Sequence, residues 1–261
     1  MKNIFALLTS TLCCSLIGNL YAQTAPSISY QNPITLSLNI SPGIIQPTNN
    51  GGVIPEVQLG TVTTIAGSSQ QIENGSYSTF GLSDGPSNSA QFYLPQGLFV
   101  DGSGNIYVAD YLNSKIRKIS TSGLVTTIAG SYFGANGFMD GEALDARFSF
   151  PSDIVSDNSG NLFVCDTWNH RIRKIDTNGI VSTYAGSTTN TGGFSDGPAL
   201  NAQFFAPEGI AIDQLGNIYI ADTGNNAIRK IDTNGNVTTI AGGEVGFLNG
   251  TTAESRFRNP T

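Results

Sequence analysis

Charged and reactive side chains are scarce in this sequence. Asp, Glu, Lys and Arg make up 12% of its 261 residues, and the chain has one His, one Trp and three Cys. Two of the cysteines, Cys13 and Cys14, lie in the first 22 residues, so only Cys165 remains after that segment. A single cysteine excludes a disulfide framework. A single histidine excludes a zinc site built from several histidines, and no Ser-His-Asp or Cys-His set is evident.

Positive charge is in deficit as well. The 12 Lys and Arg face 19 Asp and Glu, which gives a net charge of −7. Nucleic-acid binding needs a clustered positive surface, so the sequence disfavours it. No segment shows sustained helical periodicity, and 31 Gly with 11 Pro would break long helices. The 39% of hydrophobic residues nevertheless suffices for a folded core.

A period of 56 residues runs through the chain. It separates the equivalent phenylalanines Phe92, Phe148 and Phe204, and the equivalent aspartates Asp110, Asp166 and Asp222. Each unit contains four short runs with strand character, which in the third unit are residues 209–213, 217–222, 227–232 and 237–242. Asp or Asn beside Gly between the runs predicts hairpin turns and antiparallel strands. Such a unit is one four-stranded blade of a β-propeller.

The first 22 residues have the pattern of a signal peptide. An apolar run follows Lys2, and a polar neck ends at Ala22, after which we expect cleavage. The alternatives are a retained membrane anchor and a lipid anchor on Cys13 or Cys14, and the flanking residues fit both less well. The sequence therefore predicts an exported protein that is extracellular, on the cell surface or periplasmic, without stable membrane insertion. Residues 23–56 are rich in Pro, Asn and Gly and predict a leader or linker.

The propeller region spans residues 57–261 and does not contain a whole number of blades. Residues 57–67 resemble a fourth strand without its preceding three. Repeats start near residues 92, 148 and 204, and a truncated repeat starts at 257. Three blades and an orphan strand cannot close a ring, because propellers usually need four or more. Two hypotheses follow: missing C-terminal repeats complete a ring of about six blades, or two chains close it as a homodimer.

The repeated pattern FxxPxGIAxDxxGNIYxADxxNxxIRKIDxxGxVTTIAG resembles the NHL-repeat family of β-propellers, and the resemblance covers residues 57–261. The insert SDGPALNAQF between blades is similar to that of bacterial secreted NHL proteins. The resemblance implies a propeller fold. It is less specific about function, because propellers of this family serve as binding platforms, extracellular sensor parts, RNA-binding domains and occasionally enzymes.

Repetition separates scaffold from site, because a residue present in every blade is held by blade geometry. The repeated aspartates are predicted to cap the turn after the second strand. The repeated arginines are predicted to pack between blades and pair with a nearby carboxylate, and their members are Arg117, Arg173 and Arg229. Cys165 replaces an alanine of the sister repeats, so we expect it in the core.

Residues that break the pattern are candidates for function. On the upper face, where the second and third strands are joined and the first strand starts, the middle blade carries TWNHR. The predicted ligand site comprises Trp168, His170, Arg171, Leu112 and Lys115. A Trp beside His and Arg can stack on a sugar or an apolar side chain and hydrogen-bond to it. The alternative is that Trp168 only covers the adjacent connector.

Two further breaks are carboxylates, Asp153 and Glu208, at positions near the inner mouth of the ring. Carboxylates on neighbouring blades can hold a divalent cation, although a solvated rim is the simpler interpretation. They support the alternative of a metal-dependent hydrolase similar to gluconolactonases.

The preferred hypothesis is a non-enzymatic secreted or surface scaffold that recognises a protein or a carbohydrate through its upper face. It requires no cofactor, and we leave enzymatic activity open.

Overall fold

The computed structural model describes residues 28–29, 48–49, 62–68, 81–131, 134–187 and 191–261. The chain divides into two compact units, Met1–Val62 and Thr63–Thr261. In the first unit, the described residues form one antiparallel pair, β1 (Ile28–Ser29) with β2 (Thr48–Asn49). The predicted signal peptide and most of the predicted leader lie outside the described residues. No helix among the described residues is long and apolar enough to cross a membrane.

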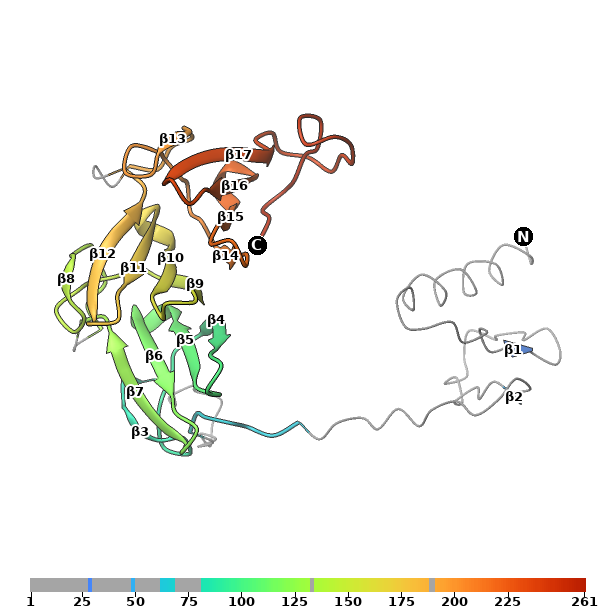
Figure 1. The fold of residues 1–261 in the computed structure, drawn as a ribbon. Coiled ribbons are helices and arrows are strands. Elements are labelled where there is room, and N and C mark those ends of the chain that lie inside the picture. Colours follow the sequence, from blue (N-terminus) through green and yellow to red (C-terminus); the bar gives the residue numbers. More distant parts are fainter. Residues whose placement is uncertain (1–27, 30–47, 50–61, 69–80, 132–133, 188–190) are drawn as a thin grey trace, which may run out of the picture. The chain divides into compact units, whose positions relative to one another are not determined.

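The described part of the second unit contains three antiparallel sheets of five strands each (Figure 1). The first consists of β3 (Gly85–Pro86), β4 (Pro95–Val100), β5 (Ile106–Asp110), β6 (Lys115–Ile119) and β7 (Leu124–Ala129). The second consists of β8 (Gly141–Glu142), β9 (Pro151–Ser156), β10 (Leu162–Asp166), β11 (Arg171–Ile175) and β12 (Ile180–Ala185). The third consists of β13 (Gly197–Pro198), β14 (Gly209–Ile212), β15 (Ile218–Asp222), β16 (Ala227–Ile231) and β17 (Asn236–Gly242).

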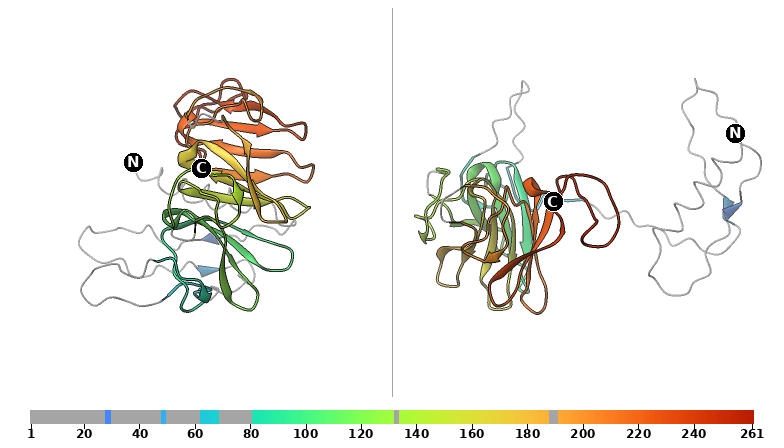
Figure 2. Two further views of the ribbon diagram at one scale, coloured as in Figure 1. Left: turned by 90° about the vertical axis from the view of Figure 1, so that its left-hand side faces the viewer. Right: turned by 90° about the horizontal axis from the view of Figure 1, so that it is seen from above.

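The three sheets are β-propeller blades that lie side by side (Figure 2). Each follows the same order, which in the second blade is β8-β12-β11-β10-β9. Four of these strands are the predicted ones. The fifth was predicted as part of a connector, but β8 pairs with the start of β12 through Gly141 and Val181. The connector forms this edge strand because its backbone covers the otherwise unpaired edge of β12.

Apolar side chains between adjacent blades form the core. Between the first and second blades, Ala109 and Ile116 pack with Ile154 and Val164. Between the second and third blades, Phe163, Cys165 and Ile172 pack with residues that include Phe204 and Ile220. Cys165 is fully buried and not in a disulfide, and burial raises the pKa of its thiol well above the ordinary value. The prediction of a core cysteine is confirmed.

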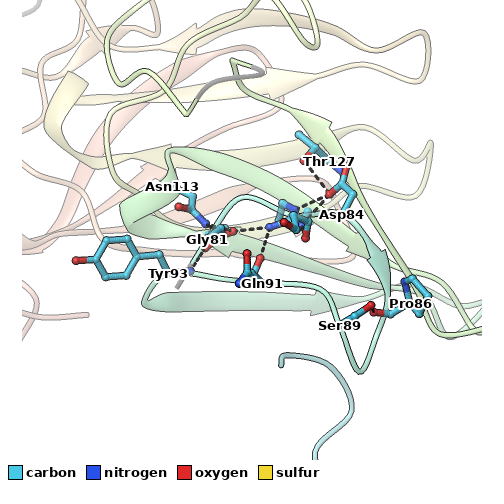
Figure 3. Close-up of polar contacts among 11 residues, drawn as sticks. Gly81, Asp84, Pro86, Ser89, Gln91, Tyr93, Asn113 and Thr127 are labelled. Carbon is cyan, nitrogen blue, oxygen red and sulfur yellow. Dashed lines mark hydrogen bonds and ion pairs between the residues drawn. The ribbon is translucent and has the colours of Figure 1, made fainter. Parts of the chain in front are cut away.

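A buried arginine in each blade fastens the connector to the sheet. In the first blade, Arg117 pairs with the buried Asp110 at 2.8 Å and with the connector's Asp84 at 2.7 Å. Asp84 also accepts hydrogen bonds from Thr127 of β7, and Asn113 donates to the Gly81 carbonyl (Figure 3). The predicted pairing of the arginines with carboxylates is confirmed. Arg173 and Arg229 repeat it in the other two blades.

The repeated aspartates have a role different from the predicted cap. The side chains of the three aspartates make no capping bond to a backbone N–H of the 3-10 turn that follows. Instead, one carboxylate oxygen of Asp110 accepts from the Tyr93 backbone N–H, and the other accepts from Asn113 and Arg117. The aspartate turns away from the cap because the buried guanidinium is a stronger donor than a terminal amide. It therefore joins the start of the first strand to the turn and to the third strand.

The two outer faces of the three-blade stack are less covered than the internal ones. Leu98 of β4 is 61% exposed, whereas its equivalent in the second blade, Ile154, is 1% exposed. Ile228 and Ala241 of the third blade are half-buried, whereas their equivalents Ile172 and Ala185 are fully buried. Both end faces thus carry the apolar side chains that, inside the stack, pack against a neighbouring blade.

A short segment, residues 62–67, precedes the first blade and ends as the fourth strand of a repeat does. Residues 62–67 are not assigned to a strand, in contrast to the predicted orphan strand, whose residues 57–61 lie outside the described residues. A strand needs a hydrogen-bonding neighbour, and the equivalent fourth strands pair with a third strand of their own blade. The end of the segment is nevertheless placed as in a repeat, because Gly67 N–H donates to the Ser87 carbonyl as Gly130 N–H donates to that of Ala143.

Candidate functional site

The upper face of the blades is built on three short 3-10 turns. These are η1 (Tyr111–Asn113), η2 (Thr167–Asn169) and η3 (Thr223–Asn225). Each turn ends at a residue in the left-handed conformation, with φ of 52° at Ser114, 55° at His170 and 53° at Asn226. The backbone is therefore the same in every blade, whereas the side chains that it presents differ.

In the second and third blades, two neighbouring positions on this face vary in a complementary way, which the first blade does not share. The backbone N–H of Trp168 donates to the Ser149 carbonyl at 3.1 Å, and that of Gly224 donates to the Phe205 carbonyl at 2.8 Å. A large side chain in the turn thus sits beside a small one in the connector, and the reverse holds in the third blade. A Cβ at Gly224 would lie 2.7 Å from the Phe205 ring, so the third blade has no room for both.

Tyr111 breaks a structural pattern that the other two turns keep. The equivalent Thr167 donates its hydroxyl hydrogen bond to the Pro207 carbonyl of the next blade at 2.9 Å, and Thr223 donates to the Pro260 carbonyl at 2.6 Å. Tyrosine cannot make this short contact. Its ring instead packs on Phe150 of the second blade, with 5.3 Å between centroids.

Phe150 occupies a backbone conformation that disfavours bulky residues. It has φ of 53° directly before Pro151, and its equivalents in the repeats are Leu94, Ala206 and Asn259 with φ of 48° each. A non-glycine residue in this region carries a cost of about 1 kcal/mol, and Asn or Asp bears it best. The repeat therefore fixes the strained backbone and leaves the side chain variable.

Together, Tyr111, Phe150 and Trp168 form an aromatic cluster across the first two blades. Trp168 meets Phe150 edge to face, with 6.1 Å between centroids and 68° between ring planes. Its indole Nε1–H donates to the Tyr111 hydroxyl oxygen at 3.2 Å. The Trp168 side chain nevertheless remains 58% exposed. The cluster is therefore a fixed aromatic platform that faces solvent.

His170 belongs to a second contact, at the junction with the third blade. Its Nδ1 accepts a hydrogen bond from the Ala206 backbone N–H at 3.1 Å, and its ring lies 5.2 Å from that of Phe205. Acceptance at Nδ1 places the proton of the neutral ring on Nε2. Burial lowers the pKa of His170, with a smaller contribution from the charge of Arg171. His170 is thus a neutral residue that joins two blades.

Two of the five predicted ligand residues are not on the surface. Arg171 is 0% and Lys115 is 3% exposed. Arg171 lies under the connector, where its guanidinium stacks 3.8 Å from the centroid of the Phe138 ring and Nε donates to the Asn169 carbonyl. Lys115 and Arg171 are the first residues of β6 and β11, two residues before the buried arginine of the same strand. Because alternate residues of a strand share a face, both side chains point to the buried side. Leu112 is half-buried beside the aromatic cluster's Tyr111 in η1.

In the predicted carboxylate pair, Asp153 and Glu208, the oxygens of Asp153 are engaged by the backbone. Asp153 accepts from the backbone N–H groups of Ile154 at 2.9 Å and Ile210 at 3.0 Å, so both of its oxygens bind the backbone. Burial raises the pKa of Asp153 and of Glu208. In the part of the chain that the structure describes, no group of three or more His, Cys, Asp or Glu is arranged to hold a metal ion. Asp153 instead links the inner strands of two blades.

The sequence matches two family models over parts of this region. Residues 148–175 match the NHL repeat, and residues 190–254 match the Teneurin NHL domain. The chain belongs to the NHL-repeat family. The NHL-repeat match covers β9, β10 and β11, and therefore includes both Phe150 and Trp168 of the aromatic cluster.

Relatives carry NHL repeats within much longer proteins. The chain is 29% identical over 189 residues to NHL repeat-containing protein 2 of Bos taurus, which is 68% of this chain and 25% of that protein. It is 27% identical over 219 residues to Teneurin-4 of Mus musculus, which is 79% of this chain and 7% of that protein. It is 36% identical over 137 residues to Protein SUPPRESSOR OF QUENCHING 1, chloroplastic, of Arabidopsis thaliana, which is 49% of this chain and 13% of that protein. The NHL chain thus matches a quarter or less of the length of these relatives.

Solved structures show similarity at a lower level. An auxiliary nutrient binding protein from Bacteroides thetaiotaomicron is 26% identical, with a TM-score of 0.47 over 54% of this chain and 36% of that one. A chain of the nidogen/laminin complex is 21% identical, with a TM-score of 0.43 over 59% of this chain and 50% of that one.

Proposed function

We propose that this NHL-repeat chain is a non-enzymatic binding scaffold that recognises a protein or a glycan through its upper face. The observation that supports it is the aromatic cluster of Tyr111, Phe150 and Trp168. No other blade has an aromatic residue at any of these three positions, so blade geometry does not require them. Exposed, well-supported aromatic side chains are enriched at recognition surfaces.

The binding proposal is testable because Trp168 is the only tryptophan of the chain. Its fluorescence therefore reports on the aromatic cluster alone. We would titrate the full chain with neutral and acidic oligosaccharides and with synthetic peptides. The proposal predicts that at least one of these classes changes Trp168 emission with a saturable dependence. It is wrong if none of them does and calorimetry also detects no binding.

Binding at this surface requires no cofactor or divalent cation in the proposal. The oxygens of Asp153 are engaged by backbone donors, and no observation favours the metal-dependent hydrolase. A chelator such as EDTA should therefore leave the binding constant unchanged. The net charge of −7 makes nucleic acid an unfavourable partner.

We also propose that the chain is exported and acts outside the cytoplasm, at the cell surface, in the periplasm or in the extracellular space. The basis is the signal-peptide pattern of residues 1–22. Mass spectrometry of the chain from fractionated source cells tests it. Export with cleavage predicts an N-terminus at Gln23, whereas an uncleaved N-terminus in the cytosolic fraction contradicts it.

The exposed end faces of the stack motivate a proposal about assembly. Further NHL blades cover both faces and complete a ring, and they come from C-terminal repeats or from a second copy of the chain. We expect these added blades to pack as the three blades pack on one another, where Ile154, the equivalent of the exposed Leu98, is buried. Light scattering of the chain separates the two sources: a dimer supports closure by a second copy, and a monomer supports closure by additional repeats.

A further inference from the structure

The exposed aromatic cluster offers a ligand one fixed ring system and one specific hydrogen-bond donor. The indole N–H of Trp168 is already bound to the Tyr111 hydroxyl oxygen. A tyrosine hydroxyl can accept and donate at the same time, so the proton of Tyr111 is available to an acceptor on the ligand. The indole ring, 58% exposed and held in place by Phe150, supplies the stacking surface.

The charges predicted for this surface are absent from it. Arg171 is buried beneath Phe138, and Lys115 is 3% exposed. His170 is neutral in its contact with the Ala206 N–H and has a lowered pKa. The three members of the aromatic cluster carry no charge. An ionic ligand group would therefore lose its hydration without gaining a partner from these residues.

We infer that the aromatic cluster binds a neutral pyranose unit of a glycan, an inference that rests on the proposed binding function of the upper face. The C–H groups on one face of a pyranose ring carry a small positive charge and are attracted to the negative face of the indole. A hydroxyl or ring oxygen of the sugar accepts the hydrogen bond of Tyr111. Neutral sugars thus match both the aromatic and the polar part of the cluster.

A proline-rich peptide is the main competitor for an aromatic surface, because such peptides dock on aromatic side chains. Their carbonyl oxygens need donors from the protein, and the indole N–H of Trp168 is engaged by Tyr111. The cluster therefore cannot offer the indole N–H as a hydrogen-bond donor to the carbonyl oxygens of such a peptide. A pyranose that stacks on the indole can accept the one hydrogen bond from Tyr111 while its outward hydroxyls stay hydrated.

The test uses defined probes with the full chain. Cellohexaose, xylohexaose and mannohexaose are the neutral glycans, hexagalacturonate is the charged glycan, and decaproline is the peptide. Affinities are measured by Trp168 fluorescence and by calorimetry. We expect saturable binding of at least one neutral hexasaccharide, and affinities at least ten-fold weaker for hexagalacturonate and decaproline.

Variants connect the binding to the cluster. Trp168→Ala should weaken the neutral glycan at least about ten-fold in calorimetry, because it removes the stacking surface. Tyr111→Phe should weaken it about five-fold, since it removes one donor and keeps the ring. Leu215→Ala is the matched control, because Leu215 is 79% exposed in a turn at the opposite end of the blade and should leave affinity unchanged.

The outcomes separate the two proposals. Binding of decaproline or hexagalacturonate in preference to the neutral sugars overturns the glycan inference and leaves the binding function of the upper face standing. Neutral glycan binding that is unchanged by both Trp168→Ala and Tyr111→Phe overturns the assignment to the cluster. Absence of binding by all five probes also overturns the inference, and the wider peptide and oligosaccharide series then decides the binding function.

Discussion

The indole Nε1–H of Trp168 donates a hydrogen bond of 3.2 Å to the hydroxyl of Tyr111, which lies 57 residues earlier in the chain and one blade away. The residues equivalent to Tyr111 are Thr167 and Thr223. Their hydroxyls instead donate to the carbonyls of Pro207 and Pro260. Between the first and second blades, an exposed aromatic contact thus replaces the threonine–carbonyl hydrogen bond of the other blades. This exchange is what distinguishes the upper face of these two blades from the rest of the repeat.

Arg173 should be essential for stability. Arg173→Ala leaves Asp166 as an unpaired buried carboxylate, and breaking a buried pair costs about 3–5 kcal/mol in the free energy of unfolding. The adjacent Lys174, half-exposed, is the control, and Lys174→Ala should change this free energy by less than about 0.5 kcal/mol. Urea denaturation measures both. Equal effects of the two variants would show that the arginine is not the anchor of the connector.

Phe150 should contribute little to folding, in contrast to its neighbour Phe148. Phe150→Asn should cost less than about 1 kcal/mol, because the tolerance of Asn for the left-handed conformation offsets the lost ring contacts. Phe148 is fully buried, so Phe148→Ala should cost about 3–5 kcal/mol. Thermal and chemical denaturation of both variants provide the comparison. A loss near 3 kcal/mol for Phe150→Asn would make Phe150 a scaffold residue.

His170 should make stability depend on pH. Its pKa in the folded chain lies below the unfolded value of about 6.5, so its contribution is present above pH 6.5 and is lost as the pH falls through the folded pKa. The physical reason is that a protonated Nδ1 can no longer accept from the Ala206 N–H. His170→Gln lacks this titration. The stability of the wild type relative to this variant should therefore decline between pH 7 and 5; an increase over that range contradicts the assignment.

Leu98 tests whether the leading face of the first blade is open in solution. In the isolated chain, Leu98→Ala should change the free energy of unfolding by less than about 0.5 kcal/mol, because the side chain is 61% exposed. Its buried equivalent is Ile154, and Ile154→Ala should cost about 2–5 kcal/mol. Denaturation at several protein concentrations measures both. Comparable losses for a chain that stays monomeric would be inconsistent with an open face.

Much of the fold follows from the repeat alone. Alternating apolar residues and the Asp-containing turns predict the antiparallel blades, and the turn geometry is present as expected, with Asp101 accepting from the backbone N–H groups of Ser103 and Asn105. The edge strand β8 could not be predicted in this way, because its two residues, Gly141 and Glu142, have no β-propensity. Tertiary pairing with β12 creates it.

The candidate site is predictable only in part, for identifiable reasons. Trp168 is exposed on the upper face as the repeat comparison predicts. Arg171 is buried because it lies two residues from Arg173 on the same side of β11. The alternation of side chains along a strand is enough to predict this placement. Tyr111 and Phe150 were missed, although both break the repeat. Their contact joins different blades, so it becomes visible only when the blades are placed side by side.

The most direct test of the account is a variant that restores the chain's own repeat residues, Tyr111→Thr with Phe150→Asn. The first substitution restores a hydroxyl like those of Thr167 and Thr223, and Trp168 remains as the fluorescent reporter. The measurement is the affinity for the best neutral hexasaccharide, together with the free energy of unfolding. The account predicts a stability within about 1 kcal/mol of wild type and an affinity at least about ten-fold weaker. Unchanged affinity in a folded variant would contradict it.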